Sequence, residues 1–137
     1  MANQYTVQII NDGPRNTVIK IEGILDTSDL GTVTVADPLT LAGIDNTGNL
    51  KAARFRIDSI QYNIKDPLSI LLTWDSIIPI RIEQLSARGT LDYHRFGGLM
   101  DNSASGDNNG KITAASTGWA AGTPLAFSIV LFLIKIQ

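Results

Sequence analysis

The clearest hydrophobic pattern in the chain is the segment 125–136, LAFSIVLFLIKI, in which both alternating faces are apolar. One face carries Leu125, Phe127, Ile129, Leu131 and Leu133, and the other carries Ala126, Val130, Phe132, Ile134 and Ile136. A strand with one solvated face would alternate apolar with polar residues. The segment is also too short for a membrane helix, which needs about 20 apolar residues. We therefore predict a buried strand, covered on one face by a second sheet and on the other by another subunit or a helix.

Segments with a two-residue period recur along the rest of the chain. The stretches 4–10 and 17–25 predict a β-hairpin, because the Asp12-Gly13-Pro14 sequence between them favours a turn. Further strands are expected at 32–35, 54–64, 68–75, 77–85, 89–96 and 111–114. The only helical feature we expect is a single turn within 26–30, with Asp26 or Thr27 as its N-cap.

These segments predict an all-β fold. The expected architecture is a single-domain antiparallel β-sandwich over residues 1–137, jelly-roll-like, with about eight strands. The stretch 26–53 has the least regular pattern, and its local structure stays open. Residues 97–110 are rich in glycine, serine and asparagine, so we expect a mobile loop there.

Composition points to an assembled protein. Charged residues make up 18% of the chain, against about 25% in an average domain, which favours a surface that is partly hidden in contacts. The net charge is −2 and no basic stripe is present, so we expect no nucleic-acid partner. Cysteine is absent, which excludes disulfides and thiolate chemistry. The first residues do not resemble a signal peptide, so we expect synthesis in a cytoplasm and no membrane partner.

His94, the only histidine, is the first candidate for catalysis. Asp92 lies two residues away, on the same face of the strand expected at 89–96. A histidine beside a carboxylate is part of many catalytic triads, but the chain has no Gly-x-Ser-x-Gly elbow or comparable nucleophile. We therefore interpret both residues as a polar strand face, and we predict that the protein is not an enzyme.

The loop 101–110, DNSASGDNNG, has a superficial likeness to a calcium loop. A calcium loop of the EF-hand type requires an acid at its twelfth position, and Ile112 occupies that position here. A weak cation site built from Asp101 and Asp107 stays open as an alternative. We predict a surface loop, and no residues are assigned to a metal, a cofactor or catalysis.

Protein contacts are the remaining role for the large apolar side chains. Trp74 ends an apolar strand and is expected in the core, whereas Trp119 lies among small residues in a loop. Trp119 either folds back onto the core or inserts into a neighbouring molecule, since aromatic residues are enriched at interfaces. The predicted interface residues are Trp119, Leu131, Phe132, Ile134, Tyr93 and Phe96.

Several segments together resemble a known group of proteins. They are the opening strand followed by DGPRN at 12–16, IQYNI at 60–64 with LTWD at 72–75, and GTLDYHRFGGL at 89–99. These features resemble small virion structural proteins of tailed bacteriophages, in which a similar aromatic, basic, aromatic, Gly-Gly run precedes a polar loop and a final apolar strand. The resemblance spans most of the chain, and 26–53 matches least.

The resemblance implies a capsid decoration protein, also called a cement protein. Such a protein binds the outside of the major capsid protein shell as a homo-oligomer, often a homotrimer, and stabilises the shell. The implied location is the capsid surface of the virion, after synthesis in the host cytoplasm. The resemblance carries no catalytic residues.

Three other functions remain as alternatives. One is a different virion structural role, in a tail, neck or fibre. Another is a carbohydrate-binding β-sandwich module, for which Trp119, Tyr93 and Phe96 would be the exposed aromatic residues. The last is an enzyme that uses His94 or Asp92.

Overall fold

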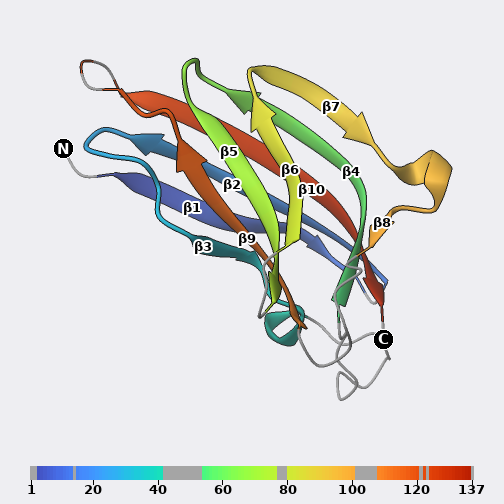
Figure 1. Ribbon diagram of the computed structural model, residues 1–137. Coiled ribbons are helices and arrows are strands. Elements are labelled where there is room, and N and C mark those ends of the chain that lie inside the picture. Colours follow the sequence, from blue (N-terminus) through green and yellow to red (C-terminus); the bar gives the residue numbers. More distant parts are fainter. Residues whose placement is uncertain are drawn as a thin grey trace.

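The computed structural model describes residues 3–13, 15–41, 54–76, 80–100, 108–120, 122 and 124–136. Within these ranges the chain forms two antiparallel sheets that pack face to face, so the predicted all-β sandwich is confirmed (Figure 1). The described ranges contain ten strands and no α-helix, against about eight strands expected. The jelly-roll connectivity stays a prediction.

The large sheet has six strands, of which five form a continuous row in the order β1-β2-β10-β4-β7, while β8 also pairs with β4. Their bounds are β1 (Gln4–Asp12), β2 (Asn16–Leu25), β4 (Arg54–Ile64), β7 (Arg88–Asp92), β8 (Leu99–Met100) and β10 (Leu125–Ile136). The small sheet has four strands in the order β3-β9-β5-β6. Their bounds are β3 (Val33–Ala36), β5 (Ser69–Ser76), β6 (Ile80–Ser86) and β9 (Asn108–Thr117). Two short 3-10 helices, η1 (Pro38–Thr40) and η2 (His94–Phe96), complete the described elements.

The hydrophobic core lies between the two sheets. The small sheet contributes β5, one of its two central strands, whose Trp74 is one of the largest buried side chains, and the large sheet contributes Phe55 from β4. Apolar residues at every second position supply most of the rest, because successive strand side chains point to opposite faces. Burial of this apolar area is the main force that holds the two sheets together.

β10 lies in the middle of the large sheet, between β2 and β4. Its inner face, from Leu125 to Leu133 at alternate positions, is buried against the small sheet. The first half of the sequence prediction is therefore confirmed: a second sheet covers one face of this strand. The opposite face points away from the small sheet, and its residues are half-buried or exposed.

An ion pair between a buried lysine and a partly exposed aspartate closes one end of the sandwich. Lys135 is the last inner-face residue of β10, and its Nζ donates to Asp12 Oδ1 at 2.5 Å and to the Gly13 carbonyl at 2.6 Å. The backbone N–H of Lys135 donates to the Arg15 carbonyl at 2.7 Å. These bonds fasten the turn between β1 and β2 to the end of β10.

Three local expectations differ from the structure. Residues 26–30 form no helical turn; instead Asn3 Oδ1 accepts the backbone N–H groups of Asp26 at 2.7 Å and Thr27 at 2.9 Å. The strand expected at 89–96 ends at Asp92, where η2 follows. The expected loop 97–110 contains β8 and the start of β9, and residues 101–107 lie outside the described ranges.

Candidate interaction surface

The outer face of the large sheet carries a continuous apolar row along β10. Val130, Phe132, Ile134 and Ile136 form this row, which we call the apolar seam, and each of them is half-buried. No element of the described chain covers the seam, because the small sheet packs on the opposite face of the large sheet. A polar strand face would be expected in this position if it met only water.

The neighbouring strands widen the seam at Val18 and otherwise border it with polar groups on both sides. The register places Val18 of β2 beside Phe132, and Ser59 of β4 on the other side of Phe132. One step along, Lys20 and Gln61 flank Val130. The surface therefore has an apolar centre with a polar border, the arrangement found in protein–protein interfaces.

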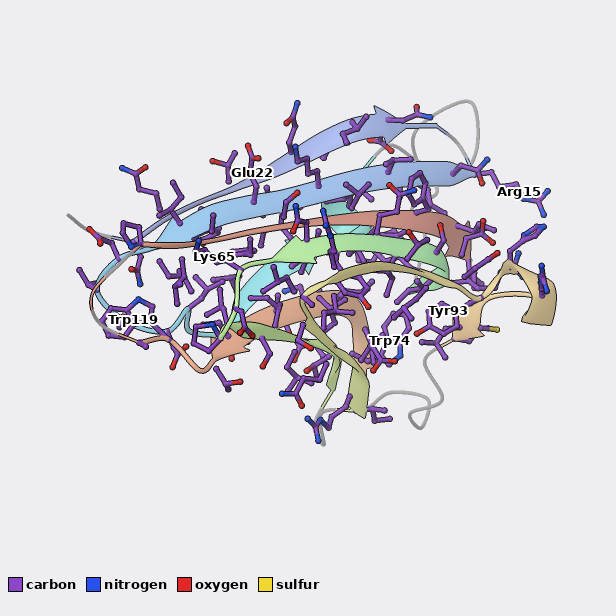
Figure 2. All side chains as sticks on the ribbon, turned by 90° about the horizontal axis from the view of Figure 1, so that it is seen from above. Arg15, Glu22, Lys65, Trp74, Tyr93 and Trp119 are labelled. Atoms are coloured by element: carbon purple, nitrogen blue, oxygen red, sulfur yellow. The ribbon has the colours of Figure 1, made fainter. Side chains whose placement is uncertain are left out.

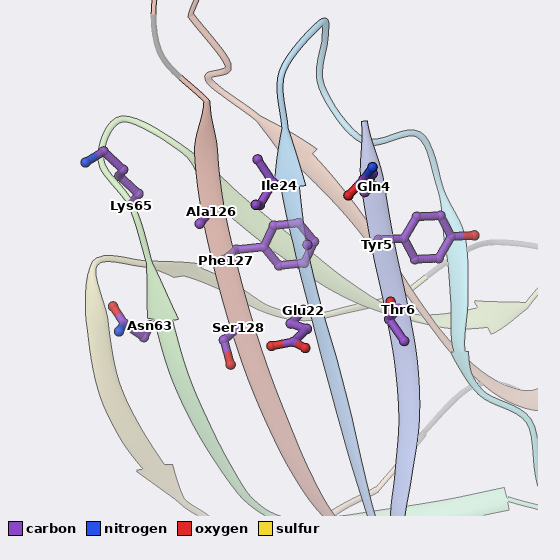
Figure 3. Close-up of a pocket in the computed structure, with 11 residues that line it drawn as sticks. Gln4, Tyr5, Thr6, Glu22, Ile24, Asn63, Lys65, Ala126, Phe127 and Ser128 are labelled. Carbon is purple, nitrogen blue, oxygen red and sulfur yellow. The ribbon is translucent and has the colours of Figure 1, made fainter. Parts of the chain in front are cut away.

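The other end of the same face is hollowed and lined by both polar and apolar groups. A groove of about 660 Å³ lies there, lined by Gln4, Tyr5, Thr6, Glu22, Gly23, Ile24, Asn63, Lys65, Ala126, Phe127 and Ser128 (Figure 3). At the edge of the groove, the Glu22 carboxylate forms an ion pair with the Lys20 ammonium at 3.4 Å. The lining offers hydrogen-bond donors and acceptors to a partner, in contrast to the apolar seam farther along β10.

Gly23 explains how β1 and β2 approach each other beneath this groove. A Cβ atom added at Gly23 would lie 2.5 Å from the Gln4 carbonyl oxygen and 3.0 Å from the Phe127 ring. Any larger residue would force β1 away from β2. The absent side chain therefore allows the Phe127 ring and the β1 backbone to come together at this point.

His94 is placed differently from the sequence expectation. Its ring Nδ1 lies 3.1 Å from Asp58 Oδ1, whereas Asp92 Oδ1 accepts the backbone N–H of His94 at 2.9 Å. The His94 side chain is 78% exposed. Asp58 lies 36 residues earlier on another strand, so no local pattern could have identified it as the ring partner.

Tyr93 is turned toward its own core. The side chain is half-buried against the hydrophobic cluster, and its hydroxyl donates to Glu83 Oε2 at 3.5 Å. Burial raises the pKa of Tyr93 above its ordinary value of 10, and the negative charge of Glu83 adds to this effect. The Phe96 side chain lies outside the described part of the structure.

Trp119 folds back onto its own chain. Its indole Nε1 donates to the Leu25 carbonyl at 3.1 Å, and its backbone N–H donates to Asp29 Oδ1 at 2.9 Å. Asp29 also accepts a hydrogen bond from Ser116, at 3.0 Å, which joins the end of β9 to the connection between β2 and β3. Figure 2 shows Trp119 and Arg15 at opposite ends of the sandwich.

The remaining predicted interface residues lie on opposite faces of β10, because alternate strand residues point to opposite sides of the sheet. Leu131 is fully buried in the core, whereas Phe132 and Ile134 lie on the outer face. Sequence reasoning did not single out β1, where Tyr5, Ile9 and Ile10 are 47%, 48% and 53% exposed. The available signal was the uncharged, β-forming run QYTVQII at 4–10.

The described residues show neither a cluster of metal ligands nor a membrane-spanning helix. No group of three or more histidine, aspartate or glutamate side chains there could hold a metal ion. Asp101 and Asp107, the alternative cation ligands, lie outside the described ranges. None of the described helices is long and apolar enough to cross a membrane.

Comparisons with protein families, curated proteins and solved structures found no match to this chain. The fold and surface define the chain as an antiparallel β-sandwich with an uncovered apolar sheet face.

Proposed function

We propose that the protein is a structural virion protein of the capsid decoration, or cement, type. In this proposal it binds the outside of a bacteriophage shell built from the major capsid protein, assembles as a homo-oligomer and stabilises the shell. It is made in the host cytoplasm, ends on the capsid surface and performs no catalysis. The apolar seam on the outer face of β10 is the observation that carries the proposal.

The seam supports a contact with a large, repeated surface. Contiguous exposed apolar area usually marks a site of protein interaction, and the low charged fraction of 18% fits a protein that buries much of its surface. The seam lies on a central strand of a six-stranded sheet, so its shape is held by backbone hydrogen bonds on both sides. A rigid contact surface loses little conformational entropy on binding.

The resemblance of segments 12–16, 60–64, 72–75 and 89–99 to small virion proteins supports the choice of a capsid shell as the partner. A decoration protein binds many equivalent sites on one particle. Modest affinity at each site is sufficient when linked copies bind together, because the second contact forms at high effective concentration.

The test is sedimentation of shells assembled from the major capsid protein encoded in the same genome, with and without added purified protein. We expect the protein to pellet with the shells and to saturate at a fixed ratio to the capsid protein. The variant Phe132→Asp places a charge in the centre of the seam and should lose this binding.

Leu71→Asp is the matched control. Leu71 is also a half-buried apolar residue on a central strand, but the register of β5 places it on the outer face of the small sheet, on the other side of the molecule. This variant should bind shells as the parent does. The proposal is wrong if the parent protein stays in the supernatant, or if both variants bind equally.

A further inference from the structure

The strand β1 forms an open edge of the large sheet. It pairs with β2 on one side, and no described strand pairs with its other side (Figure 1). Half of the backbone N–H and C=O groups of an edge strand point away from its neighbour and can pair with another strand. Residues 4–10 contain no charged residue and no proline, so nothing in their sequence blocks such pairing.

The inner face of β1 is also incompletely covered. Val7 packs against the core, but Tyr5 and Ile9, which point the same way, are about half exposed. A groove of about 350 Å³ runs between β1 and the β3 side of the sandwich, lined by Val7, Ile9, Ile19, Thr34, Val35, Asp37, Thr40 and Leu41. The sandwich is therefore open along this edge.

The other described edges are shorter or carry charge. β3 has four residues, and β7 has five, including Arg88 and Asp92. β6 has seven residues and carries Arg81 and Glu83. Charged or short edge strands are the usual protection against unwanted pairing. β1 has nine residues, and its one charged residue, Asp12, lies at its end. Residues 4–10 therefore lack this protection, which is expected of a strand that has a partner.

The order of residues in β1 matches that of a second copy. In an antiparallel pair of β1 strands centred on Val7, the Val7 residues of the two copies face each other. Tyr5 of each copy faces Ile9 of the other, and Thr6 of each copy faces Gln8 of the other. Aromatic residues opposite β-branched residues are favourable cross-strand pairs. The absence of charge means that no like charges meet across the axis.

We propose that two copies of the chain associate through their β1 strands, in antiparallel register about Val7, so that one sheet runs across both molecules. The twofold axis lies perpendicular to the sheet, so the same patch is used on both copies. The groove beside Val7 and Ile9 of one copy then meets that of the other. This contact gives an even number of copies in place of the trimer expected from the sequence.

The same axis places both apolar seams on one side of the dimer. A dimer of this kind could bind the shell through two seams at once, and this part of the inference rests on the proposed function. The self-association itself is measured without shells. Its failure therefore leaves shell binding to be judged by the sedimentation experiment.

Cysteine cross-linking tests the register directly, because the chain contains no cysteine of its own. Residues that face each other across an antiparallel pair have Cα atoms about 4.5–5.5 Å apart, within the range of a disulfide. Val7→Cys should therefore form a covalent dimer of twice 14.8 kDa on oxidation. Tyr5→Cys and Ile9→Cys should each stay uncross-linked alone. In the proposed register the two copies of either residue are offset by four positions along the strands, which is about 14 Å.

A mixture of Tyr5→Cys and Ile9→Cys chains should cross-link, because these two positions face each other in the proposed register. The inference is overturned if Val7→Cys does not cross-link, or if all three single variants do so equally. Circular dichroism of each variant confirms that the sandwich is folded before oxidation.

Light scattering coupled to size exclusion tests the association without cross-linking. The parent should have a mass of twice 14.8 kDa, and Ile9→Lys should halve it. Ile24→Lys is the matched control, since Ile24 is 43% exposed but lies on β2 rather than on the edge. The double variant Tyr5→Glu/Ile9→Lys should restore the dimer by two Glu–Lys pairs. A parent that is monomeric or trimeric overturns the inference.

Discussion

Adjacent residues of β10 should respond in opposite ways to the same charge. Leu131 is 0% exposed and points into the core, whereas Phe132 points to the outer face and is half-buried. We compare Leu131→Asp with Phe132→Asp, because each replaces a large apolar side chain with the same carboxylate. The expected difference comes only from the side of the sheet on which the residue lies.

At Leu131 the substitution removes more stability than the fold can tolerate. Truncation of a buried leucine costs about 2–5 kcal/mol, and a carboxylate among apolar side chains adds a desolvation penalty of several kcal/mol. A single domain is stable by only about 5–15 kcal/mol. We therefore expect Leu131→Asp to unfold or to accumulate as insoluble protein.

At Phe132 the loss is much smaller. Full burial of a phenylalanine is worth roughly 1.5–3 kcal/mol, and Phe132, which is only partly buried, loses part of that amount. The lower strand propensity of aspartate adds up to about 1 kcal/mol, while the carboxylate itself stays hydrated. The sum of about 2 kcal/mol lowers the melting temperature of a domain of this size by roughly 6–10 °C.

Soluble expression, far-ultraviolet circular dichroism and thermal melting distinguish the two variants. Phe132→Asp should be soluble, rich in β-structure and moderately destabilised, and Leu71→Asp should match it in the absence of shells. If Leu131→Asp stays soluble and melts within a few degrees of the parent, the assignment of the inner face is refuted. The same conclusion follows if Phe132→Asp is the variant that unfolds.

Two further predictions concern polar groups at the ends and edges of the sandwich. Asp12→Ala should lower the free energy of unfolding by about 3 kcal/mol, because it removes the carboxylate that Lys135 Nζ contacts at 2.5 Å. Lys135→Met removes the buried charge itself and should change the free energy of unfolding by less than about 1 kcal/mol. Urea denaturation measures both variants, and a larger loss for Lys135→Met than for Asp12→Ala would contradict this reasoning. Tyr93 has a raised pKa, so the folded state holds its proton more tightly than the unfolded state does, and stability should fall as the pH rises above about 10. Tyr93→Phe should make that decline shallower, and an unchanged slope in denaturation measured from pH 9 to 11 would show that burial of the hydroxyl is not its source.

Local order along the chain was predictable where the alternation of side chains was clear. The hairpin of β1 and β2 and the strands β4 and β5 lie close to their expected positions, because a two-residue period and turn residues such as Gly13 act over a few residues. β9 is longer than expected, at Asn108–Thr117, because its small residues carry little hydrophobic signal. The strand expected at 89–96 ends at Asp92, and η2 follows it. There the Asp92 side chain accepts the backbone N–H of His94.

Contacts between distant segments were not predictable from the single sequence. Asp58 reaches the His94 ring because the register of β4 and β7 places Ser59 opposite Asp92. Trp119 had two open alternatives, and the Leu25 carbonyl and Asp29 decide between them. These partners are fixed by strand pairing between residues far apart in the chain, which no local period encodes.

The sequence by itself determined that this is an all-β domain with a final strand apolar on both faces, because the alternation of side chains is a local property of the strand. Only the tertiary structure decided which face of β10 the small sheet covers and which stays open, and that β1, uncharged over residues 4–10, is a long edge strand. Strand order decides both outcomes, because the same alternating strand is central or marginal according to the neighbours that pair with it.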